Sequence, residues 1–583
     1  MTESRDSKHK ILSESYMRLA LVNMFVLMAT NICGFIDNIV IGRFLGPAAL
    51  AAVGFFSPVS VVVGMTFVVI TGTGIISGSL IGQGRQEEVT SLFGASFLIL
   101  TVFSTLLCMA LIFAGAPLAA LLGAKGEAAL LLTDYMRGFA FSVVVSSLSS
   151  YMILLAPYNN EIRRSYAATA AMFFGNIILD ILMARAMGIF GIGLASALSG
   201  LFSFLIILPG FLNTSHTIYL GKCRIPWTLV AEALKRGSFV LFFSGGMLVK
   251  NVLIIYTMVS FVGDMGVAIA NVLASACGIL GTVTGGFANA HSALSGVSYG
   301  EEDRESYVDL FYIALRRGLA WMGAIVVLTA VFSGALSELF FPEGGETAAF
   351  GRVMFLTGFW FFIPNLAMNL ILNSYKVIGR MKLVNFLSFF GTAAVGVITL
   401  FSVYLFGVNA AWAANAFSDL IVLLIIIVSV FVWKKGICFS AEAVLKLPES
   451  FGAAREEYRE YSLNAKDEVA VLSEDIMNFF GERGCDKKKA FWIALCVEEM
   501  TRNIFEHGMF TPGRNHIDVR VVHGERLTVC IKDDCQKFDP RERIGMYAPK
   551  DPEKNIGLRM VAAMAEHVDY YNNAGINSLI IKL

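Results

Sequence analysis

The distribution of charge along the chain changes sharply near residue 435, and this change limits what the chain can fold into. Of the 90 charged residues in the 583-residue sequence, 46 are spread over residues 1–440 and 44 lie in the last 143 residues. Hydrophobic residues make up 56% of the whole chain, which is well above their share in an ordinary globular protein. The first part is therefore expected to lie in a lipid bilayer and the second part in water.

The first part contains twelve apolar runs that are long enough to cross a bilayer. A spanning helix needs about 20 mostly apolar residues. Six runs lie near 17–41, 51–80, 91–115, 130–156, 166–187 and 191–212, and six more lie near 238–262, 266–295, 312–335, 350–375, 383–405 and 409–433. The sequence therefore predicts a multi-pass α-helical membrane protein with 12 spans, arranged as two six-helix bundles.

Basic residues in the loops predict the orientation of these spans. Alternate loops place 19 Lys and Arg residues on one side and only five on the other, namely Arg43, Lys125, Arg137, Arg185 and Arg352. Because basic residues accumulate on the cytoplasmic side, both termini are predicted to be cytoplasmic, in a protein of the plasma membrane. The formal net charge is zero, so the charge balance gives no argument for a nucleic-acid partner.

The two sets of six spans show signs of an internal repeat. GPAALA at 46–51 follows the first span, and GDMGVA at 263–268 follows the seventh span 217 residues later. GR at 84–85 and GE at 300–301 follow the second and eighth spans, at an offset of 216. Two six-helix repeats with both termini on one side are parallel repeats. This arrangement places a cavity between the halves, as in alternating-access carriers.

Four ionisable residues fall inside predicted spans, where a charge costs about 2.5–3.5 kcal/mol on insertion scales and needs a reason. They are Asp37 in span one, Asp180 in span five, Lys250 in span seven and Asp419 in span twelve. Asn176 lies one helical turn before Asp180, so both share a helix face, and an amide there can support a protonated or ion-bound carboxyl group. The alternative is that these groups pair with each other or reach an interface.

Several segments of the first part resemble the multidrug and toxic compound extrusion (MATE) family. They are DNIVIGRFLGPAALAAVG at 37–54, NIILD at 176–180 and GIGLAS at 191–196. The resemblance covers about residues 15–435. It implies a twelve-helix antiporter in which inward H⁺ or Na⁺ drives the export of small organic compounds. It also implies that an N-terminal cavity exchanges a cation, lined by Asp37, Asn176, Asp180 and Ser196. Lys250 has no family counterpart, and with Asp419 it is a candidate substrate-cavity residue.

The last part of the chain has the pattern of a mixed α/β domain at 463–583, behind a linker at 436–462. Apolar residues at helical spacing predict a helix around 472–480, and a second helix is expected at 487–507. Alternating residues at 516–522 and 526–532 predict a hairpin, and a further helix is expected near 556–566, with closing strands near 567–571 and 578–582. The linker contains REEYREY at 455–461, and the sequence favours a solvated helical connector there.

Three segments of this domain contain residues suited to catalysis or to binding a nucleotide. Glu499 and Asn503 lie four residues apart on one helix face, where a carboxylate can act as a base and an amide oxygen can hold Mg²⁺. Asp533 ends a predicted strand and could accept a hydrogen bond from an adenine amino group. Gly557 opens a predicted helix, and the start of a helix offers backbone N–H groups to phosphates.

Taken in this order, the segments resemble the histidine-kinase-like ATPase fold, and within it the anti-sigma-factor serine-kinase type. The resemblance implies an α/β sandwich that binds ATP and Mg²⁺, with Asn503 as the Mg²⁺ ligand, Glu499 as the base, and Asp533 and Gly557 at the nucleotide. It also suggests an anti-anti-sigma-like protein as a partner. The chain departs from the pattern because Cys535 and Lys537 replace two expected glycines and Asn555 replaces a third. These departures favour nucleotide binding over rapid turnover.

The sequence therefore predicts six segments: a cytoplasmic N-terminus (1–15), two membrane halves (16–213 and 238–435) joined by a loop (214–237), a linker (436–462) and an ATP-binding domain (463–583). The favoured function is cation-coupled export of drug-like compounds by a carrier with an ATP-binding regulatory domain. The alternative is a membrane-anchored signalling protein whose last domain phosphorylates Ser or Thr on a partner, or sequesters it. A third possibility, a lipid flippase, has only Lys250 in its favour.

Overall fold

The computed structural model describes most of the chain. The described residues are 2–46, 49, 52, 53, 55–122, 124, 126–214, 216–221, 225–261, 264–340, 345–434, 436, 440–512, 515–524, 527–537, 565, 567–573 and 575–582. The helix predicted near 556–566 and Gly557 lie outside these residues, so the structure does not describe them.

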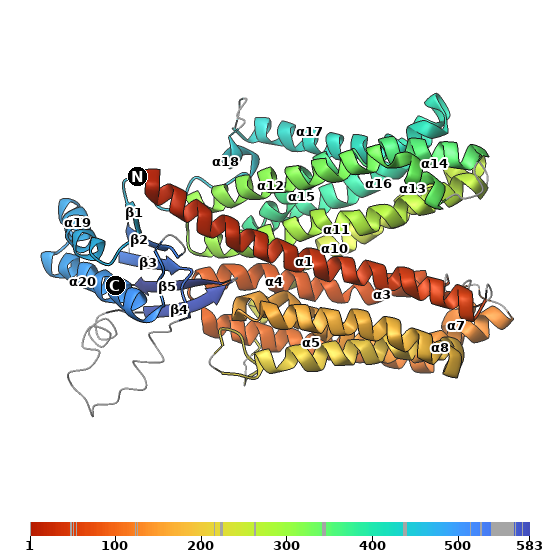
Figure 1. Ribbon diagram of the computed structural model, residues 1–583, viewed down its shortest axis with the longest axis horizontal. Coiled ribbons are helices and arrows are strands. Elements are labelled where there is room, and N and C mark those ends of the chain that lie inside the picture. The colour runs from red at the N-terminus through yellow and green to blue at the C-terminus, as the bar shows by residue number, and fades with distance from the viewer. Residues whose placement is uncertain are drawn as a thin grey trace.

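The apolar part forms two helical bundles with a smaller sheet domain at one end (Figure 1). The first bundle contains α3 (Ser57–Gly64), α4 (Thr66–Gly82), α5 (Gln86–Phe113), α6 (Gly115–Leu121), α7 (Glu127–Leu155) and α8 (Ile162–Ile207). The second contains α9 (Trp227–Gly237), α10 (Phe239–Phe261), α11 (Asp264–Gly300), α12 (Arg304–Val331), α13 (Ser333–Phe340), α14 (Gly345–Thr357), α15 (Phe362–Ile378), α16 (Met381–Phe406) and α17 (Ala414–Lys434). Short 3₁₀ turns η1 (Ala156–Asn159), η2 (Leu208–Phe211) and η3 (Val408–Ala413) connect them.

Helix α1 (Thr2–Phe44) runs between the two bundles, from the sheet domain to the far end (Figure 1). Its first half packs with the second bundle, where the Tyr16 hydroxyl donates to the carbonyl oxygen of Phe287 at 2.6 Å. Its last turns pack with the first bundle through Val40 and Ile41. One helix therefore contacts both halves of the molecule.

Within the described residues, nine helical segments are long and apolar enough to cross a membrane. The count rises to ten if α14 and α15, which are bent by 48° at their junction, form one span. The predicted fifth and sixth spans both fall in α8, which is interrupted at Gly188. That glycine has φ 63° and ψ −143°, a conformation that residues with a Cβ atom rarely adopt. The helical membrane architecture is confirmed, whereas the number of twelve spans stays a prediction.

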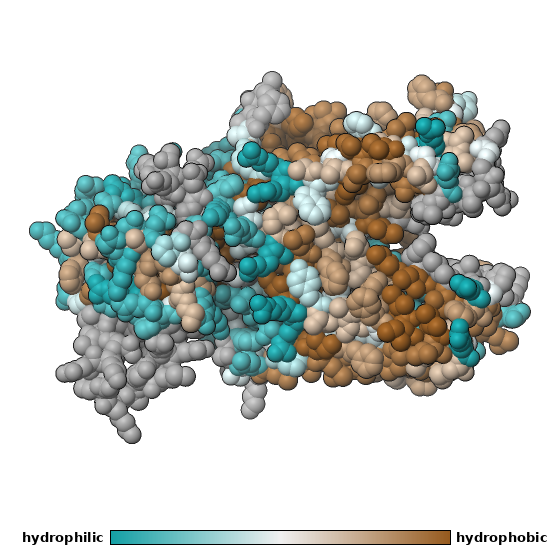
Figure 2. All heavy atoms as spheres, in the orientation of Figure 1, coloured by the Kyte–Doolittle hydropathy of each residue, from teal (hydrophilic) through white to brown (hydrophobic). Residues whose placement is uncertain are grey.

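The two halves pack closely at the end that carries the sheet domain. There the GxxxG segments 78–82 of α4 and 296–300 of α11 face each other. A Cβ atom on Gly82 would lie 2.0 Å from the carbonyl oxygen of Val297, and one on Gly300 would meet the backbone of α4 at 2.0 Å. Glycines of this spacing let helix backbones touch. At the opposite end the bundles diverge, and Figure 2 shows a hollow between them.

The sheet domain is a two-layer α/β sandwich. Its antiparallel strands are β1 (Tyr458–Leu463), β2 (Ile517–His523), β3 (Leu527–Asp533), β4 (His567–Asn573) and β5 (Ile576–Lys582), in the order β1-β2-β3-β5-β4. Helices α19 (Glu468–Glu482) and α20 (Lys487–His507) cover one face with a shared apolar core. The other face lies against the ends of the membrane helices (Figure 1). Hydrophilic side chains gather over this domain and the adjoining helix ends, and hydrophobic ones cover the middle of the bundles (Figure 2).

The linker differs from the expected solvated helical connector. Residues 458–463 form β1, an edge strand that pairs with β2 from Tyr458↔Val522 to Leu463↔Ile517, so the sheet begins five residues before the predicted start of the domain. The segment before it contains the short helix α18 (Ala441–Val444). There Leu445, Leu447 and Phe451 are buried in the core of the second bundle. The prediction was wrong because the charges of REEYREY conceal an alternation that suits an edge strand.

Candidate functional site

Two acidic side chains meet inside the first half of the membrane part. Asp37 on α1 and Asp180 on α8 lie within hydrogen-bonding reach of each other. Asp180 is 0% exposed, and among the described residues no donor reaches either of its carboxyl oxygens. Two carboxylates cannot satisfy one another, because each offers only acceptors. The pair is therefore complete only when a proton or another cation lies between its members.

Further polar groups surround this pair. Asn176 lies one turn before Asp180 on α8, and its side-chain oxygen is buried with no donor among the described residues. Cys33 of α1 and Tyr135 of α7 lie within electrostatic range of both acids. The result is a buried group of oxygen ligands suited to a proton or a hard cation. Sequence reasoning missed both neighbours. Cys33 could have been found from its position one turn before Asp37, but no signal pointed to Tyr135.

Among the described residues, Ser196 makes no hydrogen bond to this pair. It lies on the part of α8 that follows the interruption at Gly188. Its hydroxyl donates to the carbonyl oxygen of Ile192, at 3.4 Å, within its own helix. The structure places Asp37 beside Asp180, with Asn176 one turn away on α8, and cation exchange by these residues and Ser196 stays a prediction.

The two candidate residues of the second half also come together. Asp419 of α17 is 6% exposed and accepts a hydrogen bond from Asn365 of α15, with 3.0 Å between Nδ2 and Oδ2. Asn369, one turn along α15, donates to the side-chain oxygen of Asn365 at 3.0 Å. Lys250 of α10 lies within electrostatic range of Asp419. This acid, unlike Asp180, already has a donor and a cation nearby, which agrees with the simple pairing that the sequence left open.

In the sheet domain, Glu499 and Asn503 lie on the same side of α20 and are half-buried. The neighbouring Val497, Met500 and Ile504 pack into the core between α20 and the sheet, so these two polar side chains flank the buried stripe of the helix. A carboxylate and an amide oxygen one turn apart are ligands that suit Mg²⁺. The donor set therefore fits a magnesium–nucleotide complex.

Asp533 ends β3 on the face that α20 covers, and it belongs to a buried polar network. Its Oδ1 accepts from Asn577 Nδ2 at 2.7 Å and from the backbone N–H of Cys535 at 2.9 Å. Asn577 in turn accepts from the hydroxyl of Tyr570 at 2.8 Å and from Asn572 at 2.6 Å. Burial raises the pKa of Asp533 to about 7, against the opposing effect of these donors. Asp533 thus offers a carboxyl group whose charge is set near neutral pH.

Cys535 occupies one of the positions where the ATPase pattern has glycine. Its side chain is buried in the core of the domain. A Cβ atom on Gly508, at the end of α20, would lie 3.1 Å from Cys535 Cβ. The thiol side chain therefore fills space beside α20 that a glycine would leave open.

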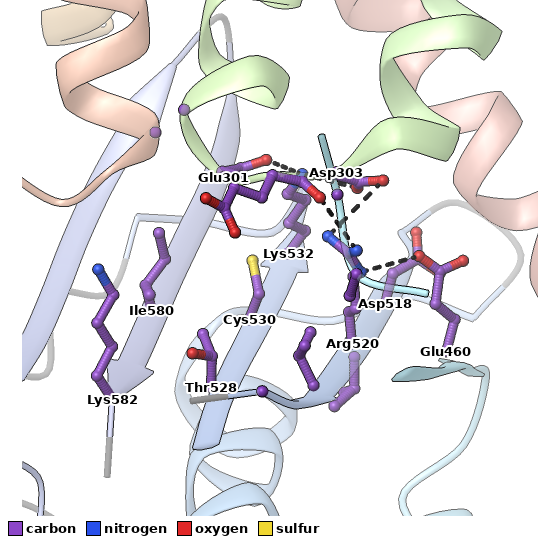
Figure 3. A pocket seen from close by; sticks show the side chains of 18 of the residues that line it. Glu301, Asp303, Glu460, Asp518, Arg520, Thr528, Cys530, Lys532, Ile580 and Lys582 are labelled. Atoms are coloured by element: carbon purple, nitrogen blue, oxygen red, sulfur yellow. Dashed lines mark hydrogen bonds and ion pairs between the residues drawn. The ribbon is translucent and has the colours of Figure 1, made fainter. Parts of the chain in front are cut away.

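The outer face of the sheet carries a third polar cluster, which sequence reasoning missed. Lys532 Nζ lies 2.6 Å from Oε2 of Glu301, in the loop between α11 and α12, and the Tyr571 hydroxyl donates to the other oxygen of that carboxylate. Arg520 lies 3.8 Å from Asp303 in the same loop (Figure 3). A cavity of about 540 Å³ opens among these side chains. The sequence offered one signal for this cluster. Three consecutive acids stand at 301–303, and each of the two predicted strands carries a basic residue, Arg520 or Lys532, at a polar position of its alternation.

Comparisons with known proteins agree with the two-part division. Residues 23–184 match the MatE family, and residues 464–583 match the histidine kinase-like ATPase domain family. No protein with a curated description of its function matches the chain.

Solved structures share the fold of the membrane part. A multidrug resistance MATE family transporter in an outward-facing conformation is 20% identical, with a TM-score of 0.66, and covers 71% of this chain and 94% of its own. A MOP superfamily transporter from Pyrococcus furiosus, described as having a binding pocket of reverse polarity, is 18% identical, with a TM-score of 0.65 and the same coverage of 71% and 94%. A mutant of the Vibrio cholerae MATE transporter VcmN is 16% identical, with a TM-score of 0.63, and covers 71% and 95%. The predicted MATE-like fold and histidine-kinase-like domain are confirmed.

Proposed function

We propose that this chain, which joins a MatE domain to a histidine kinase-like ATPase domain, is a cation-coupled antiporter of the plasma membrane that exports drug-like organic compounds. The observation that carries the proposal is the Asp37–Asp180 pair, in which the buried carboxyl group of Asp180 faces that of Asp37 and has no donor among the described residues. A structural ion pair would leave these oxygens satisfied. A site that takes up and releases H⁺ or Na⁺ needs them available.

The chemistry of the pair links the cation to the shape of the carrier. With one proton or Na⁺ bound, the two carboxyl groups share it and can stay buried between α1 and α8. Without it, two like charges repel and each favours water. Release of the cation therefore favours separation of α1 from α8 and entry of water or substrate at the pair. Uptake of a cation from the opposite side of the membrane reverses this change. The bound cation thus stabilises one conformation more than the other, as coupling requires.

The ATPase-like domain has a regulatory role in this proposal. Asn503 would hold Mg²⁺, Glu499 would lie beside the phosphates, and Asp533 would accept from the base. A bound nucleotide would supply a compact polyphosphate charge at α20. In this proposal the transport energy comes from the cation gradient, which the acidic pair of the membrane part would couple to export, and the nucleotide would only regulate the carrier. An anti-anti-sigma-like partner and phosphorylation of Ser or Thr belong to the alternative function in signalling.

Transport by purified protein in liposomes tests the proposal. The liposomes would carry ethidium, a neutral dye or an anionic dye, and efflux would be started by an imposed pH or Na⁺ gradient. Asp180→Asn is expected to lower gradient-driven efflux at least tenfold, because an amide cannot bind and release the cation. Asp134→Asn is the matched control, since Asp134 on α7 is 55% exposed, and it should transport like the wild type.

The same purified protein distinguishes the antiporter from the alternative function in signalling. Equal efflux by Asp180→Asn and wild type, for every dye and both gradients, would contradict the antiporter. If Glu499→Gln then abolished transfer of phosphate to a partner protein while no gradient drove any dye, the signalling function would replace it.

A further inference from the structure

The outer face of the sheet touches two loops that are equivalent in the two halves. Loop 83–86 runs from the end of α4 to the first residue of α5, and loop 300–305 runs from the last residue of α11 into the first turn of α12. Their sequences correspond at an offset of 216 residues. Both loops directly follow the glycine segments through which α4 and α11 pack. The sheet therefore covers the place where the two halves meet.

The contacts with the second half are charged and extensive. Glu301 is only 4% exposed where it receives Lys532 and Tyr571. The Tyr458 hydroxyl of β1 donates to Glu305 at 3.2 Å. The linker adds apolar contacts, because the ring of Phe451 stacks on Tyr299 with 4.7 Å between the centroids. The sheet domain is thus held firmly on the second half.

The contacts with the first half come from the adjoining part of the sheet. Lys582 Nζ donates to the carbonyl oxygen of Gln83 at 3.0 Å, and Gln86 Nε2 donates to the carbonyl oxygen of Tyr570 at 2.7 Å. The side chains of Tyr571 and Ile580 are buried in the core of the first half. Tyr571 therefore contacts both halves, with its ring in one and its hydroxyl on Glu301 of the other.

We infer that the outer face of the C-terminal sheet is a clasp that holds the two halves together at this end, and that nucleotide at α20 sets the strength of the clasp. Any motion that separates α4 from α11 must pull loop 83–86 away from loop 300–305. Because one sheet joins both loops, that motion must break one set of contacts. The contacts with the first half break first, since the linker and the charged contacts keep the sheet on the second half. The clasp stabilises the form that is closed at this end.

Control of the clasp by nucleotide, which rests on the proposed nucleotide binding, is possible because β3 and β4 have two faces. One face of these strands contacts the membrane part and the other contributes to the Asp533 network. Lys532 reaches Glu301, whereas the next residue, Asp533, lies on the face covered by α20. On β4 the hydroxyl of Tyr570 joins the Asp533 network through Asn577, and the next residue, Tyr571, contacts both halves. A nucleotide that changes the hydrogen bonds around Asp533 therefore acts on β3 and β4, the strands whose other face contacts the two halves.

Hydrogen exchange of the full-length protein in lipid nanodiscs, without substrate or ion gradient, tests the clasp. Tyr571→Phe and Lys532→Met are expected to speed exchange in segments 79–86 and 297–305 together by about fivefold, as the loss of a hydrogen bond or ion pair predicts. Arg459→Met is the matched control, because Arg459 pairs with Asp475 within the sheet domain. Gln86→Leu removes the hydrogen bond from the first half to the carbonyl oxygen of Tyr570 and should have the same effect on both segments. Unchanged exchange in 79–86 in all three clasp variants would overturn the clasp.

Addition of Mg-ATP to the same samples tests the control by nucleotide. In the wild type, exchange in both segments should change by about threefold or more, as expected when binding shifts a local opening equilibrium. Asn503→Ala should abolish this change by preventing binding, and Lys532→Met should abolish it by uncoupling the clasp. Bound ATP, verified with a fluorescent analogue, with no change in either segment would overturn the coupling and leave the clasp standing. Because transport is not the readout, failure of the antiporter proposal would not be mistaken for failure of either part.

Discussion

At the scale of single residues, the chain removes several carboxyl groups from water and treats them differently. Asp419 receives an amide donor, Glu301 receives a lysine and a tyrosine hydroxyl, and Asp180 faces another acid. The first two arrangements satisfy the charge permanently. The third leaves two acceptors facing each other, which a mobile cation would satisfy in the proposed antiporter. Local environment, and not residue type, therefore separates the acids with permanent partners from the pair that we propose to exchange a cation.

Asp533 gives a prediction about pH. The folded domain keeps the proton on this side chain up to about pH 7, whereas an unfolded chain releases it near pH 4. Ionisation of Asp533 therefore destabilises the domain as pH rises between these values. Because the ionised carboxylate accepts a stronger hydrogen bond from an adenine amino group than the neutral acid does, Mg-ATP affinity should fall on going from pH 8 to pH 6, by at most about tenfold for each pH unit below the pKa.

Calorimetric titration across this range would measure the effect. Asp533→Asn provides the control, since it retains an acceptor without a titrating group and reports the pH dependence of the phosphates alone. Parallel pH profiles for the two proteins would contradict a direct role of Asp533 in binding.

At the scale of elements, the period-two alternation of β3 and β4 lets the same strands serve two surfaces. Odd-numbered residues of β3, Val529 and Ile531, pack under the helices, and the even-numbered Lys532 reaches the membrane part. Sequence patterns predicted the strands, because alternation is local. They did not predict the clasp, because Lys532 and Glu301 lie 231 residues apart and a solvated outer face has the same alternation.

The contact between α4 and α11 gives a prediction at this scale. Gly82→Val should force the two backbones apart, because even a Cβ atom would lie 2.0 Å from a carbonyl oxygen. Overpacking of this kind costs about 1–3 kcal/mol, so the thermal unfolding midpoint should fall. The control is Gly323→Ala on α12, where nothing lies within 4 Å of the added atom. Equal midpoints for both variants would show that the helices separate without cost.

At the scale of the whole molecule, the charge distribution and the spacing of apolar runs were sufficient to predict the two parts and the helical membrane architecture. The α/β sandwich followed from the resemblance of the last part to the histidine-kinase-like ATPase fold. The linker at 458–463 was assigned wrongly, because its charges outweighed a weak alternation that only pairing with β2 reveals. The meeting of Asp37 with Asp180 depended on how α1 crosses between the bundles. No local pattern specifies that path.

The docking of the two parts leads to a prediction about the intact protein. If a protease site is placed at 437–439, the sheet domain should remain bound after cleavage, because Leu445, Leu447 and Phe451 are buried in the second bundle and the clasp persists. Size-exclusion chromatography of the cleaved protein in detergent would measure this. Elution of the tail as a separate peak would mean that the covalent connection alone keeps the parts together.

The covalent connection between α17 and β1 has a further consequence for the cell. A switch carried on the same polypeptide meets its target at a fixed local concentration, in the millimolar range for short connections, whatever the number of copies made. Individually weak contacts with loop 83–86 are then enough. The response of each molecule would then depend only on the concentration of nucleotide. Overproduction of the protein would not lower the ratio of sheet domains to membrane parts.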